Sequence, residues 1–273
     1  MGTSGSFKGS GGKDAGDLRG AISGWLGDDA GSDPVPPNSA SDAASTTNGS
    51  PSNPLSPSAI APVIGMWKAG SRGSGGGGGG AAGGGAAGGS GGGRSSGGVR
   101  RTVARVSGPA GRASSLARAY SIGNREALEA AGLNYDDLRA LNDPLEVGQR
   151  IAEVAFESQA DSTLEDSEAR MIVAELISWI LEAPDDHPPA PDEIVRHSIE
   201  LMIAQSALLE VGDVIRQEKN QTRRHEAEAE VRQAAQVLAS QVTLGGTGAT
   251  SAEITTAIEN GVAQLKEIYG GAE

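Results

Sequence analysis

The chain has 273 residues, 42 of them glycine and 13 proline, and a formal net charge of −13. It contains no cysteine, which excludes disulfide bonds, cysteine-based zinc sites and a thiol nucleophile. No apolar run approaches the roughly 20 residues of a membrane span, and the N-terminus lacks the apolar core of a signal peptide. We therefore expect a cytoplasmic protein without membrane contact.

Residues 1–13 are predicted to form a flexible leader, in which nine of the thirteen residues are glycine, serine or threonine. Initiator methionine is normally removed when the next residue is as small as glycine, so the mature chain is expected to begin at Gly2. Its α-amine, with a pKa of about 8, is partly neutral and nucleophilic near pH 7. The leader is therefore predicted to be modified or grasped by a partner; a ragged terminus without a function is the alternative.

A short amphipathic helix is predicted over residues 14–27, with Leu18, Ile22, Trp25 and Leu26 on one side. Three internal glycines weaken it, so alone it is expected to be mostly unfolded. It is interpreted as a recognition element that orders on a partner, or as a segment without a role. Residues 28–96 are rich in serine, proline and glycine and are predicted to be a disordered linker.

Residues 97–273 are predicted to form an all-α domain that begins with basic helices. Pro109 should split the first of these into helices over 99–107 and 109–121. Short helices are expected at 124–131, 134–141 and 144–158. A longer helix is expected from a capping box over residues 162–165, Ser-Thr-Leu-Glu, to residue 181, and another from Pro191 to about 217. The last two helices are expected over 222–242 and from a second capping box at Thr250 and Glu253.

Charge is unevenly distributed along the chain. No acidic residue lies between Ala43 and Arg125, whereas residues 126–273 hold 29 acidic against 10 basic side chains. The basic region over 94–125 is predicted either to associate with the acidic domain or to contact nucleic acid or an acidic partner. The proposed phosphate or partner contacts are Arg100, Arg101, Arg105, Arg112 and Arg118.

No residue pattern indicates catalysis, a metal site or a cofactor. The glycine run lacks the Lys-Ser/Thr ending of a phosphate loop, and no serine sits in a nucleophile elbow. Asp185, Asp186 and His187 lie in a proline-flanked loop, which argues against a metal site. Gly2 with Ser6 matches the M-G-x-x-x-[ST] pattern of N-myristoylation. A lipid-anchored peripheral protein is therefore one alternative function.

The opening Met-Gly-Thr-Ser, the stretch GGVRRTVARVSGPAGRASSLARAY and the acidic helical half together resemble the QatB-like proteins of bacterial Qat anti-phage defence systems. The resemblance covers the layout of most of the chain, and its specific parts are residues 1–4 and about 97–242. Such systems also encode an ATPase, an enzyme like the queuosine-pathway enzyme QueC and a TatD-like nuclease.

The resemblance implies a non-catalytic adaptor rather than an enzyme. The QueC-like enzyme would join a 7-deazaguanine to Gly2, while Thr3, Ser4 and Gly5 would be read as the leader enters its active site. The helical domain would dock partner proteins, among them the ATPase and the nuclease. The alternative function is a nucleic-acid-associated scaffold that binds phosphates through residues 94–125.

Overall fold

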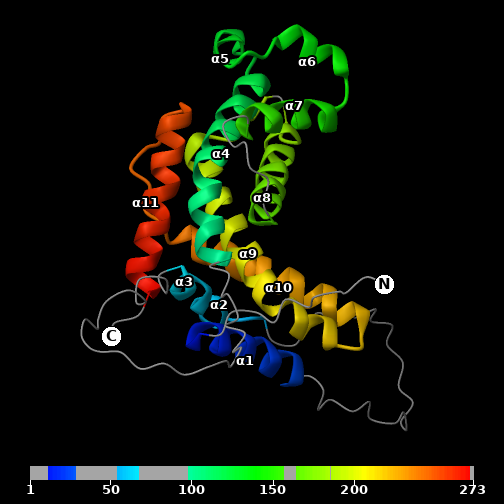
Figure 1. Cartoon of the computed structure of the whole chain (residues 1–273), viewed down its shortest axis with the longest axis vertical. Coiled ribbons are helices and arrows are strands. Elements are labelled where there is room, and N and C mark those ends of the chain that lie inside the picture. Colours follow the sequence, from blue (N-terminus) through cyan, green and yellow to red (C-terminus); the bar gives the residue numbers. More distant parts are fainter. Residues whose placement is uncertain (1–11, 29–53, 68–97, 157–163, 185, 271–273) are drawn as a thin grey trace, which may run out of the picture.

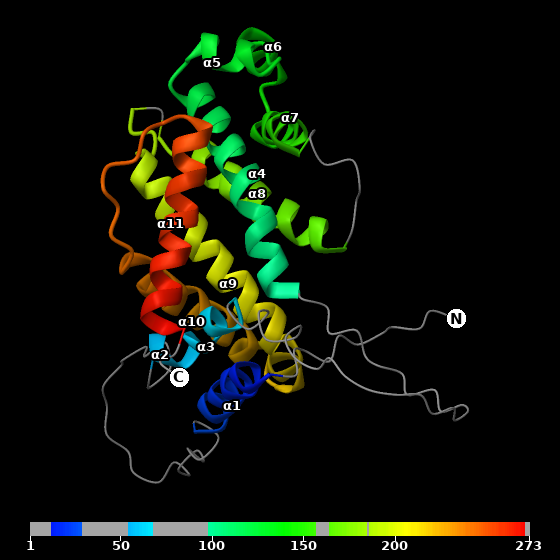
Figure 2. The same ribbon diagram turned by 60° about the vertical axis from the view of Figure 1, so that its left-hand side comes forward.

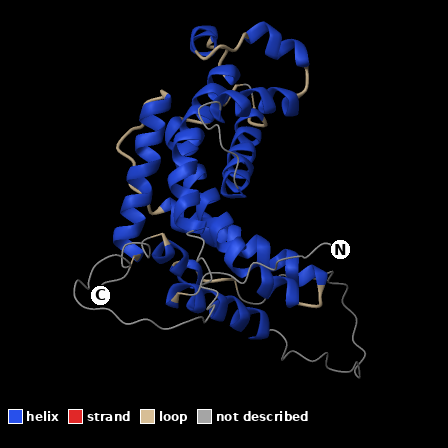
Figure 3. Ribbon diagram, in the orientation of Figure 1, coloured by secondary structure: helices blue, strands red, loops and turns tan. Residues whose placement is uncertain are grey.

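The computed structural model describes residues 12–28, 54–67, 98–156, 164–184 and 186–270. Within these ranges the chain forms eleven helices and no strand, so the predicted all-α class is confirmed (Figure 3). The helices are α1 (Lys13–Asp28), α2 (Pro57–Ile60), α3 (Pro62–Met66), α4 (Gly98–Ser121), α5 (Arg125–Ala130), α6 (Tyr135–Leu141), α7 (Pro144–Phe156), α8 (Leu164–Leu181), α9 (Pro191–Gln217), α10 (Gln221–Ser240) and α11 (Ser251–Tyr269).

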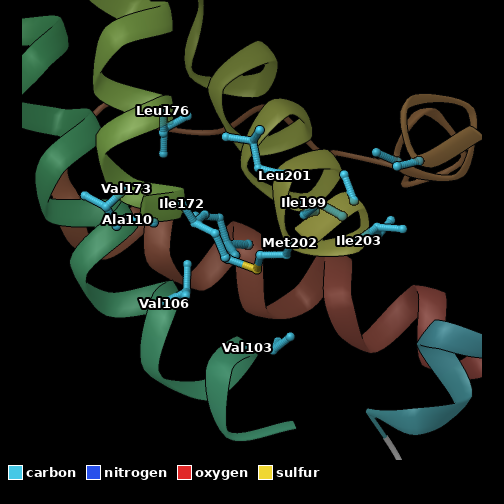
Figure 4. Close-up of a cluster of buried hydrophobic side chains, with 14 of the residues drawn as sticks. Val103, Val106, Ala110, Ile172, Val173, Leu176, Ile199, Leu201, Met202 and Ile203 are labelled. Carbon is cyan, nitrogen blue, oxygen red and sulfur yellow. The ribbon is translucent and has the colours of Figure 1, made fainter. Parts of the chain in front are cut away.

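Helix α9 is the hub of the fold, because it packs against α1, α3, α4, α8, α10 and α11. Figure 4 shows part of the core, where α4, α8 and α9 meet. The buried side chains there are Val103, Val106, Ala110, Ile172, Val173, Leu176, Ile199, Leu201, Met202 and Ile203. Burial on several sides explains why α9 is apolar around most of its circumference rather than along one stripe.

Helix α4 corrects the prediction of two helices separated at Pro109, because it runs unbroken through that residue. A proline inside a helix costs about 3 kcal/mol. Val103, Val106 and Leu116 are all buried against neighbouring helices, and each side chain of this kind contributes about 1.5–3 kcal/mol. Packing against α7, α8 and α11 therefore outweighs the lost backbone hydrogen bond.

The helix termini follow local sequence signals where such signals exist. Thr250 and Glu253 form the predicted capping box of α11: the Thr250 N–H donates to Glu253 Oε2 at 3.1 Å, and the Glu253 N–H donates to Thr250 Oγ1 at 3.3 Å. Asn220 caps α10 by accepting from the Thr222 N–H at 2.9 Å. Residues 162 and 163 of the other predicted capping box lie outside the described residues.

The predicted linker over 28–96 is wrong for residues 54–67, which form α2 and α3 within the core. Ile60, Ile64 and Trp67 are buried there, and α3 packs against α1, α9 and α11. In Figures 1 and 2, α1, α2 and α3 lie together at one end of the molecule, and α5 and α6 lie at the opposite end. We call α1, α2 and α3 the N-terminal layer.

Candidate functional site

The leader residues Gly2, Thr3, Ser4 and Gly5 lie outside the described residues, whereas the helix that follows the leader is fully described. Gly12 is the first described residue, and its carbonyl accepts the first backbone hydrogen bond of α1, from the Gly16 N–H at 3.1 Å. Eleven residues precede Gly12. At no more than about 3.6 Å per residue, their contour length is at most about 40 Å.

Helix α1 packs on the body of its own chain. Leu18, Ile22 and Leu26 are buried, Trp25 is half-buried, and α1 contacts α2, α3, α9 and α10. Burying three such aliphatic side chains contributes about 4–8 kcal/mol, which exceeds the penalty of about 1 kcal/mol for each internal glycine. Residues 14–27 are therefore ordered on the helical body of their own chain. This corrects the prediction that the segment lies unfolded until a partner protein binds.

An ion pair fixes the position of α1 on α9. The Nε of Arg19 donates to Glu210 Oε1 at 2.9 Å, and Arg19 Nη2 lies 2.8 Å from the same oxygen. The Glu210 side chain has no exposed surface, whereas that of Arg19 is 34% exposed. A carboxylate buried so completely is tolerated only with donors nearby, so this contact favours one placement of α1.

Two of the five predicted phosphate contacts on α4 donate hydrogen bonds to other parts of the protein. Arg112 Nε donates to the Ala155 carbonyl at 2.9 Å, and Arg118 Nε donates to the Pro189 carbonyl at 3.2 Å. Arg105 is half-buried. The side chains of Arg100 and Arg101 lie outside the described residues. Arg112 and Arg118 thus tie α4 to carbonyls of α7 and of the segment before α9, which gives these basic residues a structural role.

A concave surface lies where α8 ends, α9 begins and α10 ends. We call it the Trp179 groove; its volume is about 750 Å³. It is lined by Trp179, Glu182, Ala183, Pro184, His187, Pro189, Glu193, Arg196, His197, Glu200, Gln236, Ala239 and Ser240. Sequence reasoning did not identify it, because its residues come from three helices whose packing the sequence pattern does not specify.

An aromatic pair lies in the Trp179 groove. The rings of Trp179 and His197 stack with centroids 4.3 Å apart and an angle of 31° between their planes. Both residues are half-buried, so part of each ring faces solvent. His197 Nδ1 lies 3.2 Å from Glu200 Oε2, which fixes the orientation of the imidazole.

A second concave surface, of about 470 Å³, lies between residues 243–248 and α11, and hydrogen bonds hold several of its polar groups. Gln264 Oε1 accepts from the Thr243 N–H and Gln264 Nε2 donates to the Thr243 carbonyl, both at 3.0 Å. Hydrogen bonds from Thr250 lower the pKa of Glu253 below its usual 4.5. The pKa of Asp192 is similarly lowered by hydrogen bonds from Thr247. These contacts hold residues 243–250 against α11 and the start of α9.

Within the described parts of the chain, no group of three histidine, aspartate or glutamate side chains is arranged to hold a metal ion. His187 Nδ1 pairs with Asp186 Oδ2 at 3.0 Å on the surface, and Asp185 lies outside the described residues. No helix among the described residues has the length and apolar character needed to cross a bilayer.

Comparisons with protein-family models, with curated proteins and with solved structures found no match to this chain. The candidate site therefore stands on its residues and their geometry alone.

Proposed function

We propose that this protein is a non-catalytic adaptor of an anti-phage defence system that receives a 7-deazaguanine on Gly2 from a QueC-like enzyme. The observation that carries the proposal is the juxtaposition of two segments. A leader that is rich in glycine and serine, with only small residues from Gly2 to Ser6, is followed directly by a helix that packs on the body of the chain.

The chemistry of the leader suits amide formation. ATP would convert the deazaguanine carboxylate into an acyl adenylate and release pyrophosphate. The neutral α-amine of Gly2 would then attack the acyl carbon, so that the amide C–N bond forms, the bond to AMP breaks, and the amine loses one proton. Thr3, Ser4 and Gly5 are small enough to follow Gly2 into a narrow active site. The leader has a contour length of at most about 40 Å. This length separates Gly2 from α1, so that an enzyme can bind Gly2 while α1 stays packed on the helical body.

The anchored helix supports the adaptor part of the proposal. Because Leu18 and Ile22 are buried against the core, a group attached to Gly2 stays tethered to the helical body. A partner that recognises both the tag and the body would gain from their high effective concentration. The ATPase and the TatD-like nuclease are the partners that we propose for the helical body.

The test is the intact mass of the full chain, with sequencing of its N-terminal peptide, after co-expression with its neighbouring genes. We expect removal of Met1 and a mass increase on Gly2 that matches a deazaguanine acid less one water. Gly2→Leu, which should retain Met1, is expected to abolish the addition. Gly9→Ala, a change of similar kind within the leader, should preserve it.

Other outcomes of the same measurement contradict the proposal. A free Gly2 amine in the presence of the modifying enzyme would leave the leader without this role. An acyl mass on Gly2 would instead indicate a lipid anchor. A chain that continues upstream of Met1 would remove Gly2 as the acceptor altogether.

A further inference from the structure

We propose that the Trp179 groove binds a guanidinium group presented by an arginine-containing peptide segment of a partner protein. This inference is independent of any modification at Gly2. It rests on three features of the groove: an aromatic surface, an excess of carboxylates with unused oxygens, and a volume that suits a peptide side chain with its flanking backbone.

The aromatic surface selects for flat cations. The indole of Trp179 is half-buried and stacked on His197 at 4.3 Å, so its orientation is fixed before a ligand arrives. Tryptophan is the best aromatic partner for a cation, and arginine is the more common cation in such contacts. Because a guanidinium is planar and weakly hydrated, it stacks on an indole more favourably than an ammonium does.

Three carboxylates line the groove, and each uses one oxygen within the protein. Glu182 Oε1 accepts from Ser178 Oγ at 2.9 Å. Glu193 Oε2 accepts from the Ala190 N–H at 2.7 Å, and Glu200 Oε2 lies 3.2 Å from His197 Nδ1. In the described part of the chain the second oxygen of each carboxylate takes part in no further hydrogen bond. The second oxygen of each carboxylate is therefore available to accept a charge-assisted hydrogen bond from a guanidinium N–H.

The cations already near the groove do not neutralise it. Arg196 is the one arginine or lysine of the lining, which also contains His187 and His197, against three carboxylates. Its Nη1 donates to the Ser240 carbonyl at 3.0 Å. Arg118 donates through Nε to the Pro189 carbonyl, and its side chain is not part of the lining. The strongly acidic half of the chain, with 29 acidic and 10 basic residues after Arg125, adds long-range attraction for a basic partner.

A peptide fits the groove better than a free cation does. At about 750 Å³ the groove is in the size range of sites that hold a ligand of many atoms, and it spans the ends of three helices. An arginine side chain would lie over Trp179, and its flanking backbone would extend along the lining toward Gln236. We therefore assign the groove to a segment of a partner protein.

The test uses the full chain and three capped tripeptides, acetyl-Gly-X-Gly-amide, in which X is arginine, lysine or citrulline. Binding is followed by NMR through the indole N–H signals of the three tryptophans, with that of Trp179 assigned by Trp179→Phe. We expect the arginine peptide to shift the Trp179 signal selectively. Citrulline, which lacks the charge, should bind about tenfold more weakly, and lysine about threefold more weakly.

Two variants complete the test. Glu200→Gln keeps the size of the side chain and is expected to weaken binding of the arginine peptide by about fivefold. Glu259→Gln, at an exposed position of α11 outside the groove, should leave binding unchanged. Equal binding of arginine and citrulline, or an equal effect of the two variants, would overturn the proposal. Free arginine that binds as tightly as the peptide would assign the groove to a small molecule and also contradict it.

Discussion

Helices α1 and α9 are stabilised in contrasting ways. Helix α9 has 27 residues and packs against six other helices, and its apolar positions follow a helical repeat over most of its length. Helix α1 has 16 residues with glycines at positions 16, 20, 24 and 27, and its helical state depends on contacts with the rest of the chain. A weak local preference thus does not identify a segment as unfolded, because a few buried side chains outweigh it.

The difference between the two helices is testable with one matched pair of substitutions. Ile203 in α9 and Ile22 in α1 are both almost fully buried. We expect Ile203→Ala to lower the global free energy of unfolding by about 3–4 kcal/mol, because the cavity lies at the centre of the core. Ile22→Ala should mainly raise amide exchange within α1, with a smaller global effect.

Denaturant unfolding and hydrogen exchange on the two variants would distinguish these outcomes. An equal global loss would show that α1 and α9 unfold as a single unit, and the contrast between them would then disappear.

The ion pair between Arg19 and Glu210 provides a second test of how α1 is held. Arg19→Ala removes two contacts to a carboxylate with no exposed surface, so we expect a loss of about 2 kcal/mol in the unfolding free energy. The double variant Arg19→Met with Glu210→Leu should restore much of that loss, because no buried charge remains. Urea titrations measure both values. A double variant as unstable as Arg19→Ala would contradict this electrostatic explanation.

Glycine replacements test whether α1 is limited by its own helix propensity. A Cβ at Gly20 would meet no atom within 4 Å, so Gly20→Ala is expected to stabilise the protein by about 0.5–1 kcal/mol. Gly111 in α4 is the matched control: a Cβ there would collide with Thr255 and lie 2.8 Å from the Ser251 carbonyl. Gly111→Ala should therefore destabilise the contact between α4 and α11 by about 1–3 kcal/mol. Thermal denaturation would reveal whether the two substitutions have these opposite signs.

The start of α11, unlike α1, is set by local capping, and its stability should depend on pH. Thr250 lowers the pKa of Glu253, so the capping interaction is fully present above the usual value of 4.5 and is lost as the pH falls through the lower folded-state value. We expect amides 251–254 to exchange faster at pH 3 than at pH 6 after correction for the intrinsic rate. In Glu253→Gln the exchange rates of these amides should depend less on pH than in the unmodified chain. An equal pH dependence in the two proteins would contradict the assignment of this effect to Glu253.

The sequence predicted the helices from α5 to α11 well because their boundaries carry local signals. Pro144, Pro191 and the capping box at Thr250 mark helix starts that the structure confirms. The wrong predictions share one cause. The continuity of α4 through Pro109 and the burial of Trp67 both depend on packing against helices that are distant in the chain. A local sequence pattern does not contain information on that packing.

The candidate site shows the same limit. Trp179 adjoins an apolar stripe and His197 lies on a helix whose buried positions dominate its pattern, so neither residue stands out in the sequence. Only the packing of α8 against α9 places the centroids of their two rings 4.3 Å apart. The one signal in the sequence that could have indicated the groove was the position of Trp179, next to the apolar stripe of its helix and close to the end of that helix.

The central claim is that the N-terminal layer belongs to the folded body, so that the leader starts from a fixed helix. Hydrogen exchange of the unmodified full chain, resolved by peptide, tests it most directly. We predict that amides 18–26 in α1 exchange at least about a hundredfold more slowly than in an unstructured peptide, though faster than the centre of α9. Exchange of α1 at the rate of an unstructured peptide, with α9 still protected, would contradict the claim.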